Sequence, residues 1–586
     1  MRTWSILAVA LALLVTLHHP AAAWTYGDTL TVIWKPLPNL PTILRPGDTL
    51  TVWARASSSA SDWSAALWLG TLSYPLAPAG GGWNASYGWW VLGFSVPQGL
   101  AEEVYDLTMA CSTCPPDTAR HAVKVLPAFK SDFYFAQISD THVPSHVFSS
   151  DGGFSVSDTS GLVDFNAVIN DLNFIHPEFV LHTGDLVNEG ELEEYLGMYE
   201  MGRAQGMIQQ LRDPVYFVSG NHDIGGWDAT TPPPGTSRKN WWRYFGWPAL
   251  ANPPAGYPYH LQVYSFDYGL LHCIGMEGYQ NSGSYDDYLP AIYGSNSMTQ
   301  EQMNWLAADV AAVPAGHGKL AFLHYDFGSQ FTNLATLGLD GAIWGHNHGV
   351  AEGNRTAQPF NLGLQSVISR RAFRIFRVRD GVITPGPMHL AGGGGSVPTD
   401  SLTITWAGAN DGTRSALTAT VFNRYGEDWN HSRLVFYLAD HDSVFGVDRG
   451  TITQVVRQGG KAAIYVDCPI GAGRILIVTV SAIGPAGVTS LQAAALRLSP
   501  PRPNPFRSGS LSLDYTLPLG GTVHAGIYDL AGRLVATLFS GPAEAGEHAL
   551  AWSGRSDSGD PVEPGLYLVR LATPAGERRT KLVVLR

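Results

Sequence analysis

The chain has 586 residues, which is too many for a single hydrophobic core, so three to five domains are expected. Hydrophobic residues make up 45% and charged residues 15% of the sequence, which excludes a disordered chain. With 65 glycines and 18 tryptophans, the composition favours turn-rich β domains over helical bundles. The net charge of -13 argues against nonspecific attraction of nucleic acid, so no specific nucleic acid partner is expected.

Residues 1–23 have the composition of a secretory signal peptide. Arg2 supplies the positive start, residues 6–17 form the apolar run, and residues 21–23 are the small residues of a cleavage site. The apolar run is shorter than a bilayer-spanning helix requires, so we expect cleavage rather than a membrane anchor. The mature protein is therefore expected to be secreted or to lie on a cell surface.

Residues 24–129 are predicted to form an N-terminal β-sandwich domain. Alternating apolar segments at residues 49–55 and 89–96 are separated by glycine and proline, which is typical of short sandwich strands. The aromatic residues are expected in its core, with a carbohydrate-binding platform as the alternative. Cys111 and Cys114 are expected to form a local disulfide across a turn, since one C-x-x-C is weak evidence for zinc.

The central domain is expected over residues 130–395, where strands and helices alternate. The expected segments of its first half are a strand at 133–138, a helix at 162–175, a strand at 178–181, a helix at 191–211 and a strand at 215–218. This β-α-β-α-β order predicts an α/β domain. Each strand runs into a polar turn, and in such sheets ligands bind at the carboxyl ends of the strands.

The second half of the central domain begins with a Trp-, Pro- and Gly-rich insertion at residues 224–260. Long insertions of this kind are often functional. The segments expected after it are strands at 261–264, 270–274, 320–323 and 342–344, and a helix at 299–313 that starts at a capping box. His324 follows the third of these strands, and Gly345-His346-Asn347-His348 follows the fourth.

After four glycines at residues 392–395 the chain becomes β-rich again. Residues 396–495 are predicted to form an Ig-like β domain. A proline-rich linker at residues 500–505 then leads into a small β domain, so that residues 500–586 form the C-terminal segment.

Nine polar residues gather at the expected strand ends of the central domain. Their carboxylate, imidazole and amide groups suit divalent transition metals. A carboxylate that bridges two ions about 3.5–4 Å apart suits phosphoryl chemistry, because the ions hold phosphate oxygens and lower the pKa of a shared water. The nine residues are Asp140, His142, Asp185, Asn221, His222, Asp223, His324, His346 and His348.

In chain order these residues form D-x-H, G-D, G-N-H-D, a single H and G-H-x-H. This order resembles the calcineurin-like metallophosphoesterase family over about residues 132–390. The resemblance implies a central α/β sandwich of two sheets flanked by helices, and hydrolysis of phosphate esters by a metal-bridging hydroxide. It also implies two divalent or trivalent metal ions, and Mn, Fe or Zn would suit these donors.

The resemblance further implies one bridging carboxylate, Asp185, with terminal ligands on either side. The terminal ligands of the first ion would be Asp140, His142 and His348. Those of the second ion would be Asn221, His324 and His346. His317 is the other imidazole near His324, but it precedes its strand rather than ending it.

The catalytic residues that the resemblance implies are His222 and Asp223. His222 would bind no metal and would serve as general acid or donor near the leaving oxygen, while Asp223 would orient it. Two positions depart from the pattern. Tyr325 follows His324 where many relatives carry a second histidine or a nearby proline, and Asn188 ends a G-D-L-V-N stretch that supplies no arginine to the phosphate. The residue that clamps the substrate is therefore not identified.

The C-terminal segment carries a second resemblance. P-N-P-F at residues 503–506, I-Y-D-L-A-G-R-L-V at 527–535, P-G-L-Y at 564–567 and K-L-V-V-L-R at 581–586 are similar to the sorting domains of the bacterial type IX secretion system. This resemblance implies export across the outer membrane and attachment to the cell surface, or release.

Together these patterns predict a secreted dinuclear-metal phosphoesterase that acts on a phosphate-ester small molecule. One alternative is a surface-binding protein with an inactive metallophosphoesterase domain, which metal content and turnover of an aryl phosphate would distinguish. The other is a phosphodiesterase or nuclease, which a comparison of monoester with diester substrates would distinguish. The acidic composition disfavours the nuclease.

Overall fold

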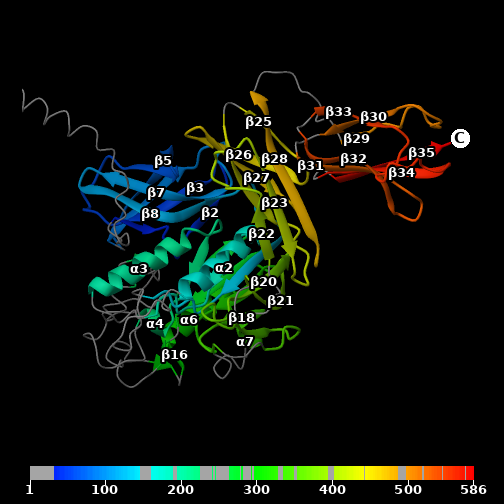
Figure 1. Cartoon of the computed structure of the whole chain (residues 1–586). Coiled ribbons are helices and arrows are strands. Elements are labelled where there is room, and N and C mark those ends of the chain that lie inside the picture. Colours follow the sequence, from blue (N-terminus) through cyan, green and yellow to red (C-terminus); the bar gives the residue numbers. More distant parts are fainter. Residues whose placement is uncertain are drawn as a thin grey trace, which may run out of the picture. The chain divides into compact units, whose positions relative to one another are not determined.

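The structure is a computed structural model of the chain (Figure 1). It describes residues 32–86, 88–144, 160–188, 194–224, 241, 244–245, 263–277, 279–280, 292–293, 296–326, 334–348, 353–392, 402–440, 443–485, 496–517, 521–543, 546–573 and 576–585. The expected signal peptide and most of the insertion at residues 224–260 lie outside these residues. Among the described residues, no helix has the length and apolarity needed to cross a membrane.

The chain divides into two compact units. The first comprises Met1–Asp440 and Arg449–Ser481, and the second comprises His441–Asp448 and Ala482–Arg586. The second boundary cuts the strand β28 (Ile475–Pro485), ahead of the expected domain end at residue 495.

Eight strands form the N-terminal part of the first unit. In sheet order they are β1 (Ile33–Lys35), β3 (Thr49–Ala54), β6 (Trp89–Ser95), β5 (Leu72–Asn84), β4 (Ser64–Leu69), β7 (Glu103–Cys111), β8 (Cys114–Val125) and β2 (Thr42–Leu44). β5 is long because its first half pairs with β4 and its second half with β6. Side chains from both halves of the sheet, such as Leu50, Phe94 and Leu107, share one buried core. This arrangement agrees with the expected N-terminal β domain.

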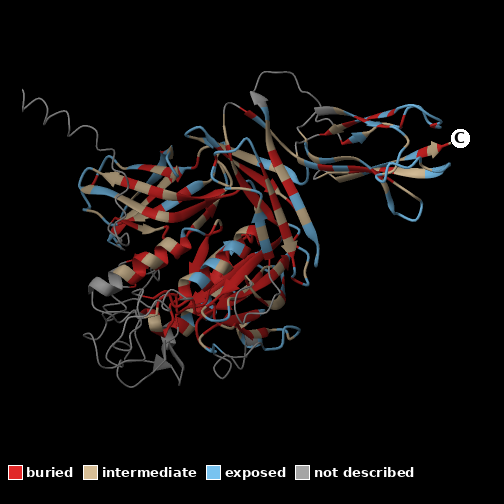
Figure 2. Ribbon diagram, viewed as in Figure 1, coloured by how far each residue is buried: buried red, intermediate tan, exposed pale blue. Residues whose placement is uncertain are grey.

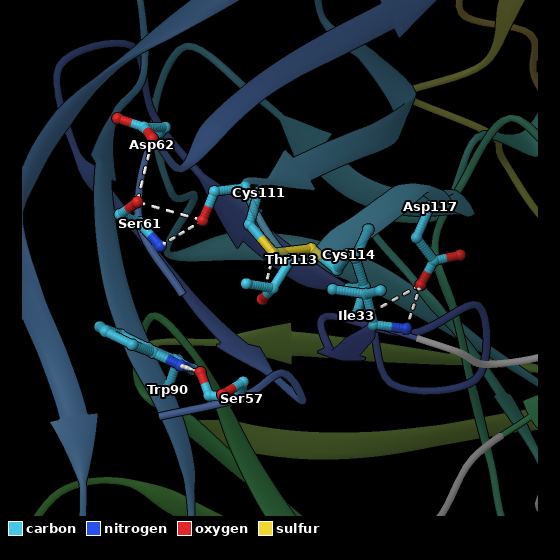
Figure 3. Close-up of a disulfide and its surroundings, with 11 residues drawn as sticks. Ile33, Ser57, Ser61, Asp62, Trp90, Cys111, Thr113, Cys114 and Asp117 are labelled. Atoms are coloured by element: carbon cyan, nitrogen blue, oxygen red, sulfur yellow. Dashed lines mark hydrogen bonds between the residues drawn. A yellow bond between two sulfur atoms is a disulfide. The ribbon is translucent and has the colours of Figure 1, made fainter. Parts of the chain in front are cut away.

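A disulfide closes the turn between β7 and β8 (Figure 3). Cys111 ends β7 and Cys114 begins β8, and their sulfur atoms are bonded, so the expected local disulfide is confirmed. Close by, the carboxylate of Asp117 accepts a hydrogen bond of 2.7 Å from the backbone N–H of Ile33 (Figure 3). This contact fixes the first strand of the N-terminal part to β8.

Two five-stranded sheets form the centre of the first unit. The first sheet has the order β11 (Val215–Phe217), β10 (Val180–His182), β9 (Asp132–Ile138), β20 (Ala372–Arg379) and β21 (Val382–Leu390). The second has the order β12 (Val263–Tyr268), β13 (Leu271–Met276), β17 (Gly318–Phe322), β18 (Gly341–Trp344) and β19 (Phe360–Gly363). β9, β10 and β11 are parallel to one another, and so are β13, β17, β18 and β19. The carboxyl ends of each parallel set therefore meet at one edge of its sheet.

An apolar core joins the two central sheets. Phe135 of β9 stacks between Phe179 and Phe376, with ring centroids 5.2 and 4.7 Å apart, and the same core contains Phe322 of β17. Every residue of β10, β11, β13 and β18 is buried. Figure 2 shows that the strands at the centre of the first unit are mostly red, the colour of buried residues. Parallel strands buried on both faces give short, continuous apolar runs, which made them recognisable in the sequence.

The segment between β1 and β2 also belongs to the central core. Leu37 and Leu40 are buried within it, although they precede the expected domain boundary by about ninety residues. The backbone carbonyl of Asn39 accepts a hydrogen bond of 3.1 Å from the N–H of Phe217 in the edge strand β11. The N-terminal segment thus satisfies part of an open edge of the first central sheet.

The helices of the first unit are α2 (Ser160–Ile175), α3 (Glu194–Ile208), α4 (Asn221–Ile224), α6 (Gln300–Ala312) and α7 (Leu334–Leu337). α2, α3 and α6 confirm the helices expected at residues 162–175, 191–211 and 299–313. Leu306 and Val310 of α6 pack against Ile274 and Ala321 on the outer face of the second sheet. Helices on the outer face of the first sheet stay a prediction. Three short strands, β14 (Tyr279–Gln280), β16 (Asn296–Thr299) and β15 (Ile292–Tyr293), form a small separate sheet.

The remaining strands form β domains, as expected. In the first unit β22 (Leu402–Trp406), β23 (Ala416–Asn423) and β28 lie side by side, and a second sheet has the order β24 (Arg433–Ala439), β27 (Lys461–Asp467) and β26 (Thr451–Gln458). The second unit contains β25 (Ser443–Val447) and two further sheets. These have the orders β29 (Arg497–Leu498), β30 (Leu511–Leu517), β33 (Gly546–Trp552), and β32 (Leu534–Ala543), β31 (Gly521–Tyr528), β34 (Gly565–Thr573), β35 (Gly576–Val584). Both sheets contribute to one core, for example through Leu513 and Ile527.

Candidate metal centre

All nine residues singled out in the sequence are described, and each follows the carboxyl end of a parallel strand. In the first sheet, β9 leads to Asp140 and His142, β10 to Asp185, and β11 to α4, which holds Asn221, His222 and Asp223. In the second sheet, β17 leads to His324, and β18 leads to His346 and His348. The polar turn expected after β11 is instead the first turn of α4.

Four of these residues form a first ligand group. Asp140, His142, Asp185 and His348 each offer an atom, and the atoms lie within 4.8 Å of one another. Nε2 of His348 lies 3.3 Å from Oδ1 of Asp140 and 3.0 Å from Nε2 of His142. Nε2 of His142 lies 3.7 Å from Oδ2 of Asp185. Three side chains of this group are buried and His348 is half-exposed, so the group opens toward solvent on one side.

A second ligand group contains Asp185, His324 and His346, whose ligand atoms also lie within 4.8 Å of one another. Nε2 of His324 lies 3.2 Å from each of three atoms: Oδ2 of Asp185, Nδ1 of His346 and Oδ1 of Asn221. The amide oxygen of Asn221 therefore faces the same point as the imidazoles.

The two groups share Asp185, whose Oδ2 lies near imidazole nitrogens of both His142 and His324. A carboxylate between two sets of nitrogen and oxygen donors is the arrangement that a dinuclear site requires. The residues present therefore fit a pair of transition-metal ions, with Asp185 placed to bridge them.

The backbone at this site is unusual. Four of the ligand residues, Asp140, His142, Asp185 and His346, have positive φ angles of 53°, 43°, 53° and 64°. A non-glycine residue in the left-handed region costs on the order of 1 kcal/mol and persists only where the surroundings hold it. The strand-end turns are thus held in conformations that aim their side chains together, and no sequence pattern shows this.

The motif glycines are required because ligand side chains occupy the space of a Cβ. A Cβ on Gly184 would lie 2.5 Å from Nδ1 of His324, and one on Gly220 would lie 2.2 Å from Oδ1 of Asp185. A Cβ on Gly345 would lie 1.8 Å from Oγ of Ser139. Each glycine of G-D, G-N-H-D and G-H-x-H therefore allows two strand-end loops to approach closely.

The ligand groups perturb one another's ionisation. Burial raises the pKa of Asp185, but the charge and hydrogen bond of His324 outweigh burial and hold that pKa far below its usual range. Burial lowers the pKa of His324, but the charge of Asp185 outweighs it and raises the pKa to about 9. Burial lowers the pKa of His142 and that of His346 to about 4. Buried carboxylates that attract positive charge, beside neutral imidazoles, are what a metal site needs.

The predicted catalytic pair lies beside the first ligand group. The ring of His222 lies 4.6 Å from that of His142, and its Nδ1 lies 2.6 Å from the carbonyl oxygen of Asn188. The backbone N–H of His222 donates to Oδ1 of Asp185 at 2.9 Å, so the carboxylate that the two ligand groups share also fixes the start of α4. His222 is therefore oriented by a backbone carbonyl that the sequence analysis did not assign.

Asp223 stabilises the segment that carries His222 through hydrogen bonds to the backbone. Its carboxylate accepts hydrogen bonds of 2.7 Å from the N–H of Gly220 and 3.0 Å from that of Val187. Burial and the nearby charge of Asp185 raise the pKa of Asp223 to about 8. These contacts mean that Asp223 acts on His222 through the backbone.

Among the other histidines of the domain, His182 lies against the ligand loops. Its Nε2 lies 3.1 Å from Oγ1 of Thr141, and the N–H of Gly184 donates to its Nδ1 at 3.2 Å. Its position directly before T-G-D was the signal available in the sequence. His272 is held by Asp267 and Asp309 and belongs to neither ligand group. His146 and His260 lie outside the described residues.

Residues 133–350 match the family model of calcineurin-like phosphoesterases, and residues 506–577 match that of the FlgD Ig-like domain. A comparison with proteins of curated function gives no match. Among solved structures, the chain is similar to the purple acid phosphatase PPD1 of yellow lupin (Lupinus luteus), at 13% identity and TM-score 0.33 over 68% of this chain and 72% of that one. It is also similar to a dimetal phosphatase from Danio rerio, at 15% identity and TM-score 0.32 over 45% of this chain and 100% of that one. These scores are too low to carry an argument, so the assignment rests on the family model.

Proposed function

We propose that this chain, whose calcineurin-like phosphoesterase domain marks it as a metal-dependent phosphoric ester hydrolase, is a secreted enzyme that holds two metal ions. The observation that carries the proposal is the shared carboxylate of Asp185 between two ligand groups. Of the two alternatives, the intact ligand set disfavours an inactive surface-binding protein. The phosphodiesterase is tested below.

The terminal ligands proposed for the two ions are those of the two ligand groups. Asp140, His142 and His348 would hold the first, and Asn221, His324 and His346 the second. When bound, the ions supply an activated water and charge stabilisation for the phosphoryl oxygens. Their donors suit Mn, Fe or Zn.

The protein groups have two further tasks in this proposal. The Asn188 carbonyl accepts the Nδ1–H of His222, so Nε2 is the ring nitrogen that would face the substrate. When the ring is protonated, Nε2–H can donate to the leaving oxygen of the ester, while the carbonyl stabilises the charged ring. Asp140 and Asp185 are buried, and their burial keeps bulk water from competing with the metal ions for these carboxylates.

The proposed substrate class is a phosphate-ester small molecule outside the cell. The secretory character of residues 1–23 and the sorting motifs of the C-terminal segment support export, with attachment to the cell surface through the C-terminal domain. The FlgD Ig-like match agrees with a small β module there. Fractionation of cells that express the chain with and without residues 500–586 tests this part, because loss of the segment should retain the protein inside the envelope.

The central experiment compares metal content with hydrolysis of mono- and bis-(nitrophenyl) phosphate in the purified chain. We expect two metals per chain in the wild type. Asp185→Ala should lose metal and activity, whereas His222→Ala should keep both metals and lose activity by about 10²- to 10⁴-fold, the usual contribution of a general acid. His524→Ala, an exposed histidine of the second unit, is the matched control.

Each outcome decides between the candidate functions. Preference for the diester would favour the phosphodiesterase. Metal without turnover of either ester would favour the surface-binding protein. No metal and no turnover in folded protein supplied with Mn and Zn would overturn the enzyme proposal.

A further inference from the structure

The loops that follow β9 and β10 continue side by side after both strands have ended. The N–H of Asp140 donates to the Gly184 carbonyl at 2.9 Å, that of His142 to the Asp185 carbonyl at 3.1 Å, and that of Val143 to the Leu186 carbonyl at 2.8 Å. We call these segments, residues 140–143 and 184–186, the paired ligand loops. They carry two terminal ligands and the bridging carboxylate, so their register sets where these ligands stand relative to one another.

His182 links the paired ligand loops through its side chain. The backbone N–H of Gly184 can only donate, so Nδ1 of His182 accepts at 3.2 Å. In the neutral ring the proton is then on Nε2, which donates to Oγ1 of Thr141 at 3.1 Å. The Thr141 hydroxyl in turn donates to the Leu186 carbonyl at 2.9 Å. The three hydrogen bonds therefore all run in one direction, from Gly184 through His182 and Thr141 to Leu186. We call this chain of hydrogen bonds the side-chain relay.

The surroundings hold this chain in place. His182 and Thr141 are fully buried, and the His182 ring stacks on Phe217 with centroids 4.8 Å apart and planes 28° from parallel. The linked loops contain Asp140, His142 and Asp185 with positive φ, which need support from outside the local sequence. The side-chain relay therefore spans the strained segments.

We propose that His182 and Thr141 are positioning residues that set the spacing of the dinuclear centre by fixing the register of the paired ligand loops. This inference rests on the dinuclear function proposed above. Neither side chain is a ligand, and each acts on Asp140, His142 and Asp185 through the backbone. Groups that orient metal ligands commonly change metal affinity or activity by about 10- to 100-fold when removed.

Substitutions of Thr141 can remove or keep the one hydroxyl group that both accepts from His182 and donates to Leu186. Thr141→Val replaces the hydroxyl with a methyl group of similar size, which leaves Nε2–H of His182 without its acceptor and leaves the Leu186 carbonyl with the Val143 N–H as its remaining donor. Thr141→Ser keeps the hydroxyl and removes only a methyl group. His182→Gln keeps an amide that can donate to Thr141 but loses the acceptor for Gly184.

The readouts are Mn(II) binding by titration calorimetry, the electron paramagnetic resonance spectrum of the Mn(II)-loaded chain, and kcat and KM for an aryl phosphate. Magnetic coupling between two Mn(II) ions depends on their bridge, so it reports the spacing of the centre. Ser432→Ala is the matched control, because it removes a buried hydroxyl that donates to the Trp429 and Cys468 carbonyls away from the paired ligand loops.

We expect Thr141→Val to weaken binding of one Mn(II) by about 10- to 100-fold, to lose the coupled spectrum and to lower kcat more than it raises KM. Thr141→Ser should stay close to the wild type, and His182→Gln should fall between them. Ser432→Ala should lower the unfolding temperature without changing the spectrum.

Two results would overturn the inference. One is a coupled spectrum and wild-type kcat in folded Thr141→Val, and the other is a Thr141→Ser variant as impaired as Thr141→Val. If Thr141→Val does not fold, an unchanged spectrum in His182→Gln overturns it equally. A wild-type chain that binds no second Mn(II) would instead overturn the proposed function and this inference together.

Discussion

Two buried clusters of the first unit both bring histidines and carboxylates together, but only one of them is arranged for metal. In the metal centre, imidazole nitrogens surround two carboxylates. In the other, which we call the junction cluster, Glu102, Lys124, His176, Asp213 and Arg433 meet. Asp213 has two partners at its Oδ1: Nδ1 of His176 at 3.1 Å and Nζ of Lys124 at 3.4 Å. The Glu102 carboxylate also has two: Nε2 of His176 at 3.4 Å and a guanidinium nitrogen of Arg433 at 3.3 Å. The junction cluster joins three parts of the first unit: Lys124 comes from the N-terminal strand β8, Asp213 precedes the central strand β11, and Arg433 begins β24.

The difference between the clusters is the source of positive charge. In the junction cluster, each carboxylate is paired with a lysine or arginine of the chain itself. In the metal centre, no lysine or arginine forms an ion pair with Asp140 or Asp185 among the described residues. Buried carboxylates need a counter-charge. Histidine and carboxylate together therefore indicate a metal site only where the chain leaves that charge to be supplied from outside.

The largest effect should come from the shared carboxylate. Asp185→Asn keeps the shape but removes the charge that serves both ligand groups, so we expect hydrolysis to fall by roughly 1000-fold or more, as for members of a catalytic unit. Metal analysis should show both ions lost. Retention of two ions and activity would contradict the bridging position of Asp185.

The opposite result is expected in the junction cluster. Lys124→Met should lower the unfolding free energy by about 3 kcal/mol, because it removes the lysine charge from the buried Asp213 carboxylate and leaves His176 as its remaining ion-pair partner. Denaturant titration measures the loss, and metal content should not change. Lys581→Met, at an exposed position, is the control and should stay within about 0.5 kcal/mol of the wild type. Loss of metal in Lys124→Met would show that the two clusters are coupled.

Added metal should sharpen the same contrast. A metal that binds only the folded chain stabilises it by about 2.7 kcal/mol at a free concentration 100 times the Kd. We expect Mn(II) to raise the unfolding free energy of the wild type and of Lys124→Met by this amount. Asp185→Asn should gain little. Equal stabilisation of all three proteins would place the bound Mn(II) elsewhere.

The smallest effect is expected at His272, a third arrangement of the same side chains. Its Nδ1 and Nε2 contact carboxylates on opposite sides of the ring, at 2.7 Å from Asp267 and 2.8 Å from Asp309, so the oxygens do not converge on one point. Burial lowers the pKa of His272, but the hydrogen bonds to Asp267 and Asp309 outweigh burial and raise the pKa to about 9.

The stabilisation by protonated His272 should be complete below the unfolded pKa of about 6.5 and should disappear as the pH rises through 9. Because Asp267 is exposed, we expect only about 1 kcal/mol. Thermal unfolding between pH 6 and pH 10 should show this decline in the wild type and not in His272→Gln. The same slope in both proteins would show that the ring is neutral in the folded state.

Much of the fold followed from local patterns. The strands expected at 178–181 and 215–218 appeared as the buried strands Val180–His182 and Val215–Phe217. The helices expected at 162–175 and 299–313 appeared as Ser160–Ile175 and Gln300–Ala312, with ends that differ by at most two residues. Domain limits were harder to predict. Leu37 and Leu40 belong to the central core, because a segment distant in sequence covers an open sheet edge there.

The sequence by itself determined which side chains could bind metal and in what order, because each motif is a short polar segment directly after its own strand. Only the tertiary structure decided how they combine. His142 and His348 are 206 residues apart, yet their ring nitrogens lie 3.0 Å from one another. That approach determines which carboxylate is shared, why four ligands accept left-handed backbone, and why His182 has a partner in each ligand loop. Contacts between segments so far apart depend on the packing of two sheets, which no local pattern encodes.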